Sequence, residues 1–243
     1  MVLPMDVSII IPAYNEEKRI LITLERTTTF LAQRPWSCEL LIVDDGSGDA
    51  TVERVRDYAS QREAEPLIRC LENGRNRGKG YSIRHGVGEA QGNCVGFMDG
   101  DYTTDIAGLD AVMPLLAEGC DGVIGDRSLS ETRIEVARRG FRQLGSQLFR
   151  RLLHKFMGLK DFGDTQCGFK FFQAPVARDL FARQKIDGFM FDVEILLLAS
   201  RCGYRIAKIP VVWSDDPDSR FNPVTGTLRD LKELLHIHWL HRR

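Results

Sequence analysis

The chain has 243 residues, of which 43% are hydrophobic and 28% are charged, and its 33 Lys and Arg against 34 Asp and Glu give a formal net charge of −1. This composition is typical of a globular protein and excludes a disordered, collagen-like or coiled-coil chain. The near-zero charge disfavours nucleic acid as a partner, because binding it usually requires a basic excess. One α/β domain is expected at this length, since a single core grows to ~250–300 residues.

Neither a membrane-spanning segment nor a secretion signal is expected. No apolar run approaches the ~18–20 residues of a spanning helix. The first residues, MVLPMDVSIIIP, have no basic start and no cleavage site. The scattered cysteines form no CxxC pair, which indicates reduced, mostly buried thiols and disfavours a zinc site. These features predict a cytoplasmic protein. The cysteines are Cys38, Cys70, Cys94, Cys120, Cys167 and Cys202.

Strand and helix patterns alternate through the first half of the chain. The predicted strands are Val7–Ile11, Glu39–Val43, Leu67–Leu71, Asn93–Met98 and Asp121–Ile124. The predicted helices are Glu16–Leu31, Asp49–Arg62, Lys79–Ala90 and Asp105–Glu118. Strands about 30 residues apart, each followed by a helix, indicate an α/β fold with a mostly parallel central sheet and helices on both faces.

The second half is less regular. Long helical patterns are predicted at Glu135–Leu159, Phe191–Cys202 and from Thr225 to the end of the chain. Strands are predicted at Phe169–Phe172 and Tyr204–Trp213, with a polar turn and an acidic, proline-containing loop between these elements. The turn is Asp161–Gly168 and the loop is Ser214–Pro223.

Polar, charged and glycine residues follow each predicted strand of the first half. In a parallel sheet the carboxyl ends of the strands share one edge, and ligands bind there. This clustering predicts an active site at that edge. The segments are PAYNEE (Pro12–Glu17), DDGSGDAT from Asp44, ENGRNRGKG ending at Gly80, DGD (Asp99–Asp101) and GDRS (Gly125–Ser128).

Asp99 and Asp101 flank Gly100 directly after the fourth strand. Two carboxylates there can share a hard cation, which prefers oxygen ligands and keeps positions open for water and phosphate. Such a cation would neutralise a diphosphate as it leaves. For the tripeptide alone a tight Asp-Gly turn is the simpler interpretation, but the position at a strand end, with Asp44 and Asp45 at the second strand, favours the metal site.

Three other patterns are weaker. GRNRGKG has the wrong spacing for a P-loop, and no GxGxxG follows the first strand. His236, His238 and His241 are interpreted as a solvated or interfacial helix end rather than a metal site. The stretch Val136–Lys160 has seven basic residues and no acid among apolar residues at helical spacing. It fits either a helix on an anionic membrane surface or ligand, or a core-packed helix with a solvated basic face.

The ordered set PAYNEE, VDDGSGDAT, NRGKG and MDGD resembles the family-2 glycosyltransferases of the GT-A fold. DTQCGFKFF (Asp164–Phe172) and FDVEIL (Phe191–Leu196) are similar to the polyprenyl-phosphate glycosyltransferases, the group of the dolichyl-phosphate glucosyltransferases and mannose synthases. Gly100 replaces the usual Ala, and the acidic WSDDPDSR departs from the mannose synthases and favours a glucosyltransferase. The resemblance implies one domain over 1–243, with a nucleotide-binding half (1–128) and an acceptor-binding half (129–243).

The resemblance also implies an inverting hexosyltransferase with a nucleotide-diphosphate sugar donor, of UDP-glucose or GDP-mannose type. Asp99 and Asp101 would hold Mg²⁺ or Mn²⁺ on the diphosphate, and Arg127 and Arg220 would face phosphate. Gln166 and Asp192 fall in family motifs and are assigned to acceptor or sugar contacts. The donor-binding residues implied are Pro12, Tyr14, Glu16, Val43, Asp44, Asp45, Lys79 and Gly100.

The implied acceptor is a polyprenyl phosphate, whose anionic oxygen needs no general base. Positioning and electrostatics would then carry the rate. The alternative is a family-2 enzyme that glycosylates a hydroxyl of a soluble or cell-wall acceptor, for which Asp192 or Glu194 could act as the base. A lipid acceptor implies peripheral attachment to the cytoplasmic face of a membrane, through residues 136–160 or 228–240, or a separate membrane-protein partner.

Overall fold

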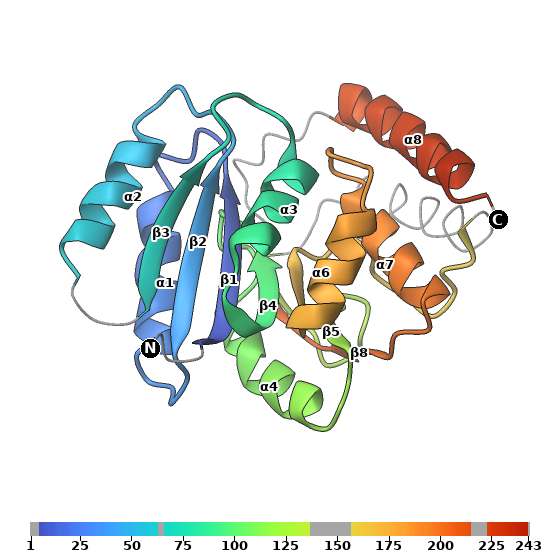
Figure 1. Ribbon diagram of the computed structural model, residues 1–243, viewed down its shortest axis with the longest axis horizontal. Helices are drawn as coiled ribbons and strands as arrows, with labels where there is room; N and C mark the ends of the chain where they lie inside the picture. The colour runs from blue at the N-terminus through green and yellow to red at the C-terminus, as the bar shows by residue number, and fades with distance from the viewer. Residues whose placement is uncertain (1–4, 63–65, 137–156, 215–222, 243) are drawn as a thin grey trace.

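The computed structural model describes residues 5–62, 66–136, 157–214 and 223–242. A seven-stranded sheet with the order β3-β2-β1-β4-β7-β5-β8 forms its centre (Figure 1). Neighbouring strands are parallel except at β7, which runs antiparallel to both β4 and β5. The predicted α/β fold is confirmed. The strands are β1 (Met5–Ala13), β2 (Cys38–Asp44), β3 (Leu67–Glu72), β4 (Gly92–Met98), β5 (Gly122–Gly125), β7 (Phe169–Gln173) and β8 (Ile206–Ile209).

Alternation of side chains along the strands divides the core into two layers. On β1, Ile10 packs into one layer, whereas Ile9 and Ile11 pack into the other, as the two-residue period of a strand requires. Helices α3, α6, α7 and α8 complete the first layer, and α1, α2 and α4 complete the second. The helices are α1 (Ile20–Leu31), α2 (Thr51–Ser60), α3 (Lys79–Glu89), α4 (Leu109–Ala117), α6 (Ala174–Arg183), α7 (Phe191–Arg201) and α8 (Pro223–Leu240).

The elements predicted for the first half are present with shifted ends. Helix α1 begins at Ile20 rather than at Glu16, because the residues before it form a turn in which Arg19 N donates to Glu16 O at 2.9 Å. The helix expected from Asp105 begins as a short 3₁₀ segment, η1 (Ile106–Gly108). There the Asp105 carboxylate accepts from Ala107 N at 2.9 Å, so the polar residue caps the turn as its position predicts.

The second half departs further from the prediction. Strands β6 (Arg133–Val136) and β9 (Val212–Ser214) form a separate parallel pair. The prediction of a helix over Glu135–Leu159 is therefore wrong at its start, and it is wrong at its end because Gly158, at φ +72, follows the last helical residue. Residues 137–156, the rest of that basic stretch, lie outside the described residues.

Two more elements differ in this half. The single strand predicted at Tyr204–Trp213 is in fact β8 and β9 in different sheets, and Pro210 between them has no N–H to donate to a ladder. No element was predicted where α6 lies. Its signal was present, since Pro175 occupies the first turn, and Val176 and Leu180 are buried at helical spacing.

Two negative expectations can be compared with the structure. Along the described parts of the chain, none of the helices has the length and apolarity needed to cross a bilayer. No disulfide joins any of the six cysteines. The expectation of buried thiols holds for Cys38, Cys94 and Cys167, whereas Cys202 is exposed.

Candidate active site

The loops after β1, β2 and β3 are tied together at the carboxyl edge of the sheet. Asp45 N donates to Ala13 O at 2.8 Å. The buried Asp45 carboxylate accepts from the backbone N of Arg77 at 2.9 Å and of Gly78 at 2.8 Å. The group that the resemblance assigns to the base and ribose thus also anchors the loop that leads into α3.

Asp44 closes the turn that follows β2. Its Oδ2 accepts from Gly46 N at 2.9 Å and from Ser47 N at 3.0 Å. Gly46 has φ +78, and a Cβ there would lie 2.6 Å from the Arg75 backbone, so only glycine fits. Val43 lies wholly inside the core. The DDGS segment is therefore a rigid support beside the nucleotide-binding edge.

The residues after β1 are more exposed. The Tyr14 side chain is 43% exposed, which is unusual for a large ring. The Glu16 carboxylate forms an ion pair with Arg19 at 2.7 Å. Pro12 is partly buried, and its carbonyl oxygen lies 2.8 Å from the position of a Cβ on Gly100. The loop after β1 therefore packs directly against the Asp-Gly-Asp turn.

That turn, after β4, contains a close ion pair. The Lys79 ammonium at the start of α3 lies 2.5 Å from Asp99 Oδ1. A Cβ on Gly168 would lie 2.0 Å from Asp99 Oδ2, so the glycine of the DTQCGFK segment leaves room for this carboxylate. Burial alone raises the pKa of Asp99, but Lys79 outweighs it and holds that pKa below its usual value.

The surroundings of Asp101, in contrast to those of Asp99, disfavour the ionised carboxylate. Its Oδ1 accepts from Thr103 N at 3.1 Å. Burial, and then the nearby charge of Asp99, raise the pKa of Asp101 to about 6. A raised carboxyl pKa means that the ionised form lacks a compensating cation. Lys79 therefore balances one carboxylate of the pair, and the second is short of positive charge.

This donor set fits Mg²⁺ or Mn²⁺. Both ions prefer carboxylate oxygens and retain positions for water and phosphate. Within the described ranges, no group of three or more His, Cys, Asp or Glu residues is arranged to hold an ion. Asp99 and Asp101 are the residues that would hold such a cation, with coordination positions left for water and phosphate.

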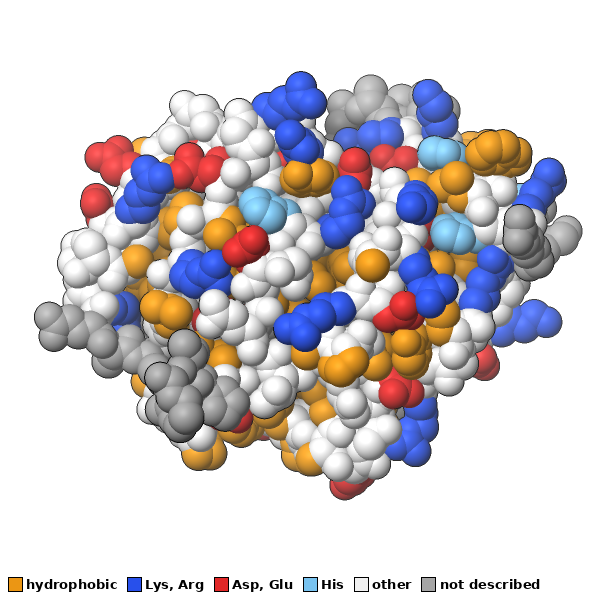
Figure 2. Space-filling view, in the orientation of Figure 1, with side chains coloured by type: hydrophobic (Ala, Val, Ile, Leu, Met, Phe, Trp, Pro, Cys, Tyr) orange, Lys and Arg blue, Asp and Glu red, His pale blue; other side chains and the backbone are white. Residues whose placement is uncertain are grey.

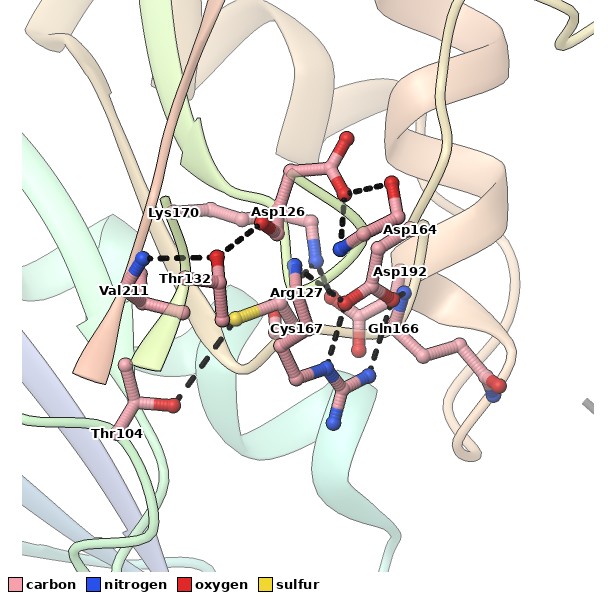
Figure 3. Close-up of polar contacts among 11 residues, drawn as sticks. Thr104, Asp126, Arg127, Thr132, Asp164, Gln166, Cys167, Lys170, Asp192 and Val211 are labelled. Atoms are coloured by element: carbon pink, nitrogen blue, oxygen red, sulfur yellow. Dashed lines mark hydrogen bonds and ion pairs between the residues drawn. The ribbon is translucent and has the colours of Figure 1, made fainter. Parts of the chain in front are cut away.

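Arg127, after β5, is held by an acidic side chain and an aromatic ring, and Figure 3 shows its contact with Asp164. Its Nε and Nη2 donate to the two oxygens of Asp164 at 2.5 and 2.9 Å, and its guanidinium lies 5.5 Å from the centre of the Trp213 ring. Burial raises the pKa of Asp164, but Arg127 overrides it and brings that pKa down to about 2. Gln166 N also donates to this carboxylate, at 3.1 Å. Arg127 is thus a fixed positive charge close to Asp99, whose pKa it helps to lower.

A second ion pair lies entirely within the protein (Figure 3). Lys170 on β7 is fully buried, and its Nζ donates to Asp192 Oδ1 at 2.5 Å and to Cys167 O at 2.7 Å. Burial raises the pKa of Asp192 although Lys170 and Lys79 oppose this. Lys170 was not among the predicted site residues. A lysine within the apolar strand GFKFF was the available signal, because a buried lysine needs an acidic partner.

The predicted site residues therefore fall into four sets. Asp99, Asp101, Lys79, Arg127 and Asp192 come together through direct contacts and mutual electrostatic effects. Gln166 lies beside them, with Nε2 4.0 Å from Met190 Sδ. Arg220 lies outside the described residues. The donor-side residues surround the neighbouring ends of β1 and β2.

The family model described as "Glycosyl transferase family 2" matches residues 8–181. The chain belongs to this family. The predicted enzyme class, a glycosyltransferase that moves a hexose, is thereby confirmed. Two similar proteins are both named dolichyl-phosphate beta-glucosyltransferase. That of Drosophila melanogaster is 34% identical and that of Homo sapiens 31% identical, each over 96% of this chain and 74% of its own length.

Two solved structures have the same architecture. Glucosyl-3-phosphoglycerate synthase from Mycobacterium tuberculosis, solved with Mn²⁺ and UDP-glucose, superposes with a TM-score of 0.71 at 19% identity, covering 96% of this chain and 79% of that protein. TarS of S. aureus, solved with UDP, gives 0.63 at 19% identity, and this chain spans 64% of its length. At such identities the likeness shows the fold, and it confirms the GT-A fold expected from the motifs.

Proposed function

We propose that this family-2 glycosyltransferase transfers glucose from UDP-glucose to the phosphate of a polyprenyl lipid, with inversion and with dependence on Mg²⁺ or Mn²⁺. The relatives named dolichyl-phosphate beta-glucosyltransferase support the hexose and the lipid phosphate. The neighbours solved with UDP-glucose, Mn²⁺ or UDP support the donor and the metal. Because the acceptor is a lipid, we also propose that the enzyme works at a membrane surface, attached peripherally on its cytoplasmic face.

One observation supports a phosphate rather than a hydroxyl acceptor: both carboxylates that could act as a base are buried and already bound to other groups of the protein. Asp192 is 3% exposed and held by the buried Lys170. Glu194 has no exposed surface, and it accepts from Ile186 N at 2.8 Å and contacts His241 Nε2 at 2.8 Å. A hydroxyl acceptor needs a base within hydrogen-bond reach of its proton. A phosphate oxygen is already anionic, so it can react in a site whose carboxylates serve other purposes.

The reaction is a single displacement. An acceptor phosphate oxygen forms a bond to the anomeric carbon, and the bond from that carbon to the donor's diphosphate breaks, so that UDP leaves with the electron pair. Asp99 and Asp101 would hold the cation, which when bound would supply positive charge to the departing diphosphate. Lys79 and Arg127 are positive charges already fixed by Asp99 and Asp164, and fixed charges stabilise developing charge without reorganisation.

A paired acceptor assay tests this function. The purified chain is incubated with Mg²⁺ and either UDP-glucose or GDP-mannose, and with a short polyprenyl phosphate or the matching polyprenol. We expect lipid-linked glucose from UDP-glucose and the phosphate only, detected by mass spectrometry, and no product after chelation of the metal. NMR of the product is expected to show the inverted anomer.

The polyprenol is the decisive control because it offers the same lipid with a hydroxyl in place of the phosphate. Transfer to the polyprenol, or to a soluble hydroxyl acceptor but not to the phosphate, would assign the enzyme to the alternative reaction. Transfer to the phosphate from GDP-mannose but not from UDP-glucose would support the proposed acceptor and show that the sugar is mannose rather than glucose.

A further inference from the structure

Helix α8 presents an apolar stripe that no other described part of the chain covers. Leu231, Leu235 and Trp239 are 45%, 64% and 67% exposed. They follow one another at intervals of four residues and therefore share one face of the helix. The opposite face is anchored in the core through Leu234 and Ile237. Figure 1 shows α8 along the outer rim of the molecule, and Figure 2 shows hydrophobic side chains and histidines at the surface there.

The charges of α8 are sorted by face. Lys232 and His236 are exposed, and helical spacing places them beside the stripe. Arg242 is also exposed and lies just beyond the end of the helix at Leu240. The carboxylates turn toward the protein. Asp230 is 8% exposed, and Glu233 accepts from Met190 N at 3.0 Å. The described part of α8 therefore combines leucine, tryptophan and cationic residues on its outer surface without an acidic side chain among them.

The stripe has a fixed place relative to the active site. Beside Glu233 and Met190, Arg229 of α8 lies 4.7 Å from the Phe189 ring, which is itself 43% exposed. The same loop between α6 and α7 contacts the start of α3, where Tyr81 N donates to Asp187 O at 3.1 Å. Because α3 begins with Lys79, the residue paired with Asp99, α8 is held next to the loop that supports the candidate active site.

We propose that the α8 stripe, Leu231, Leu235 and Trp239 with Lys232, His236 and Arg242, docks the enzyme on an anionic phospholipid surface. Tryptophan and leucine insert at the boundary between headgroups and acyl chains, and cationic residues add attraction to anionic lipids. A second copy of the chain is disfavoured as the occupant, because two cationic faces repel each other. The choice of a lipid surface rests on the proposed function, whereas the exposure and the charge of the stripe do not.

Vesicle sedimentation tests the docking without the acceptor lipid. The probes are phosphatidylcholine vesicles with and without phosphatidylglycerol, and neither contains polyprenyl phosphate. We expect the wild type to bind the anionic vesicles and to lose binding at high salt. Leu235→Gln with Trp239→Gln should weaken the binding at least about tenfold. Lys232→Gln with Arg242→Gln should weaken it about tenfold on anionic vesicles only.

Ile22→Gln is the matched control, because Ile22 is 50% exposed on α1, and this variant should bind like the wild type. Transfer to a short, water-soluble polyprenyl phosphate without vesicles should be unchanged in the Leu235/Trp239 variant. Equal vesicle binding by this variant and the wild type overturns the proposal. So does a wild-type dimer in light scattering that the variant converts to a monomer. If the wild type binds the vesicles but transfers no sugar, the proposed function is wrong while the proposed docking surface stands.

Discussion

The two sides of the catalytic edge neutralise their buried acids in different ways. On the nucleotide side, backbone N–H groups surround the carboxylates of Asp44 and Asp45. On the side built from β4, β5 and β7, cationic side chains balance the acids. These pairs are Lys79 with Asp99, Arg127 with Asp164 and Lys170 with Asp192.

These two ways of neutralising acids have different consequences, since one fixes the conformation of a loop and the other places positive charge. Amide donors close to a carboxylate hold a loop in one conformation, so Asp44 and Asp45 mainly support the edge that is proposed to bind the nucleotide. The ion pairs join residues 20, 37 and 22 positions apart. Under the proposed function they would place positive charge where a diphosphate leaves and an anionic phosphate arrives. Substitutions on the two sides should therefore fail in different ways.

Asp101→Asn should cause the largest loss. The amide cannot supply the second carboxylate that the cation site needs, so we expect transfer to fall about a thousandfold or more. The melting temperature should change little or rise, because burial and Asp99 already disfavour the charge of Asp101. Initial rates and thermal unfolding measure the two effects.

Asp105→Asn is the matched control, because Asp105 lies four residues further on and caps η1 through Ala107 N at 2.9 Å. It should retain most of the transfer rate. Metal-dependent transfer at the wild-type rate by Asp101→Asn would remove Asp101 from the cation site.

Lys170→Met should give the next largest effect, on stability. It leaves Asp192 buried without its cation, and removal of one partner of a buried pair costs about 3–5 kcal/mol in the free energy of unfolding. Lys170→Met combined with Asp192→Leu removes both charges, and we expect most of the stability to return. Urea unfolding measures this.

The transfer rate of the double variant then distinguishes two roles for the pair. If Lys170 and Asp192 contribute charge to the site, transfer stays low although the fold has recovered. Full recovery of transfer together with stability would show that the pair serves packing alone.

The sequence predicted the nucleotide side better than the charged side, for a physical reason. Strand periods, turn glycines and the Asp-Gly-Asp segment are local patterns, and so the alternating first half and its edge were predictable. Lys170 and Asp192 meet only because β7 enters the sheet antiparallel between β4 and β5. No local period encodes that insertion. The same holds for β6 and β9, which pair across 79 residues at Arg133 and Val212.

Asp164→Asn should show a pH-dependent loss of stability. Arg127 brings the pKa of Asp164 down to about 2, below the ~3.9 of an unfolded chain. This carboxylate therefore stabilises the fold fully above about pH 4, by about 2–3 kcal/mol, and the contribution is lost as the pH falls toward 2. The gap in unfolding free energy between wild type and variant should thus be wide at neutral pH and narrow under acid. A gap that does not change with pH would contradict the ion pair.

Asp45→Asn should give the smallest effect and the one most specific to the nucleotide side. Asparagine keeps one oxygen acceptor but turns an NH₂ group toward either Arg77 N or Gly78 N, both of which are donors. We expect a loss of about 1–2 kcal/mol in unfolding free energy. The KM for the sugar nucleotide should rise several-fold with kcat nearly unchanged, because a displaced loop weakens binding of the donor and of the transition state equally. A fall in kcat at constant KM would show that Asp45 acts on the chemical step, as the ion pairs are expected to do. Its role would then not be limited to holding the loop.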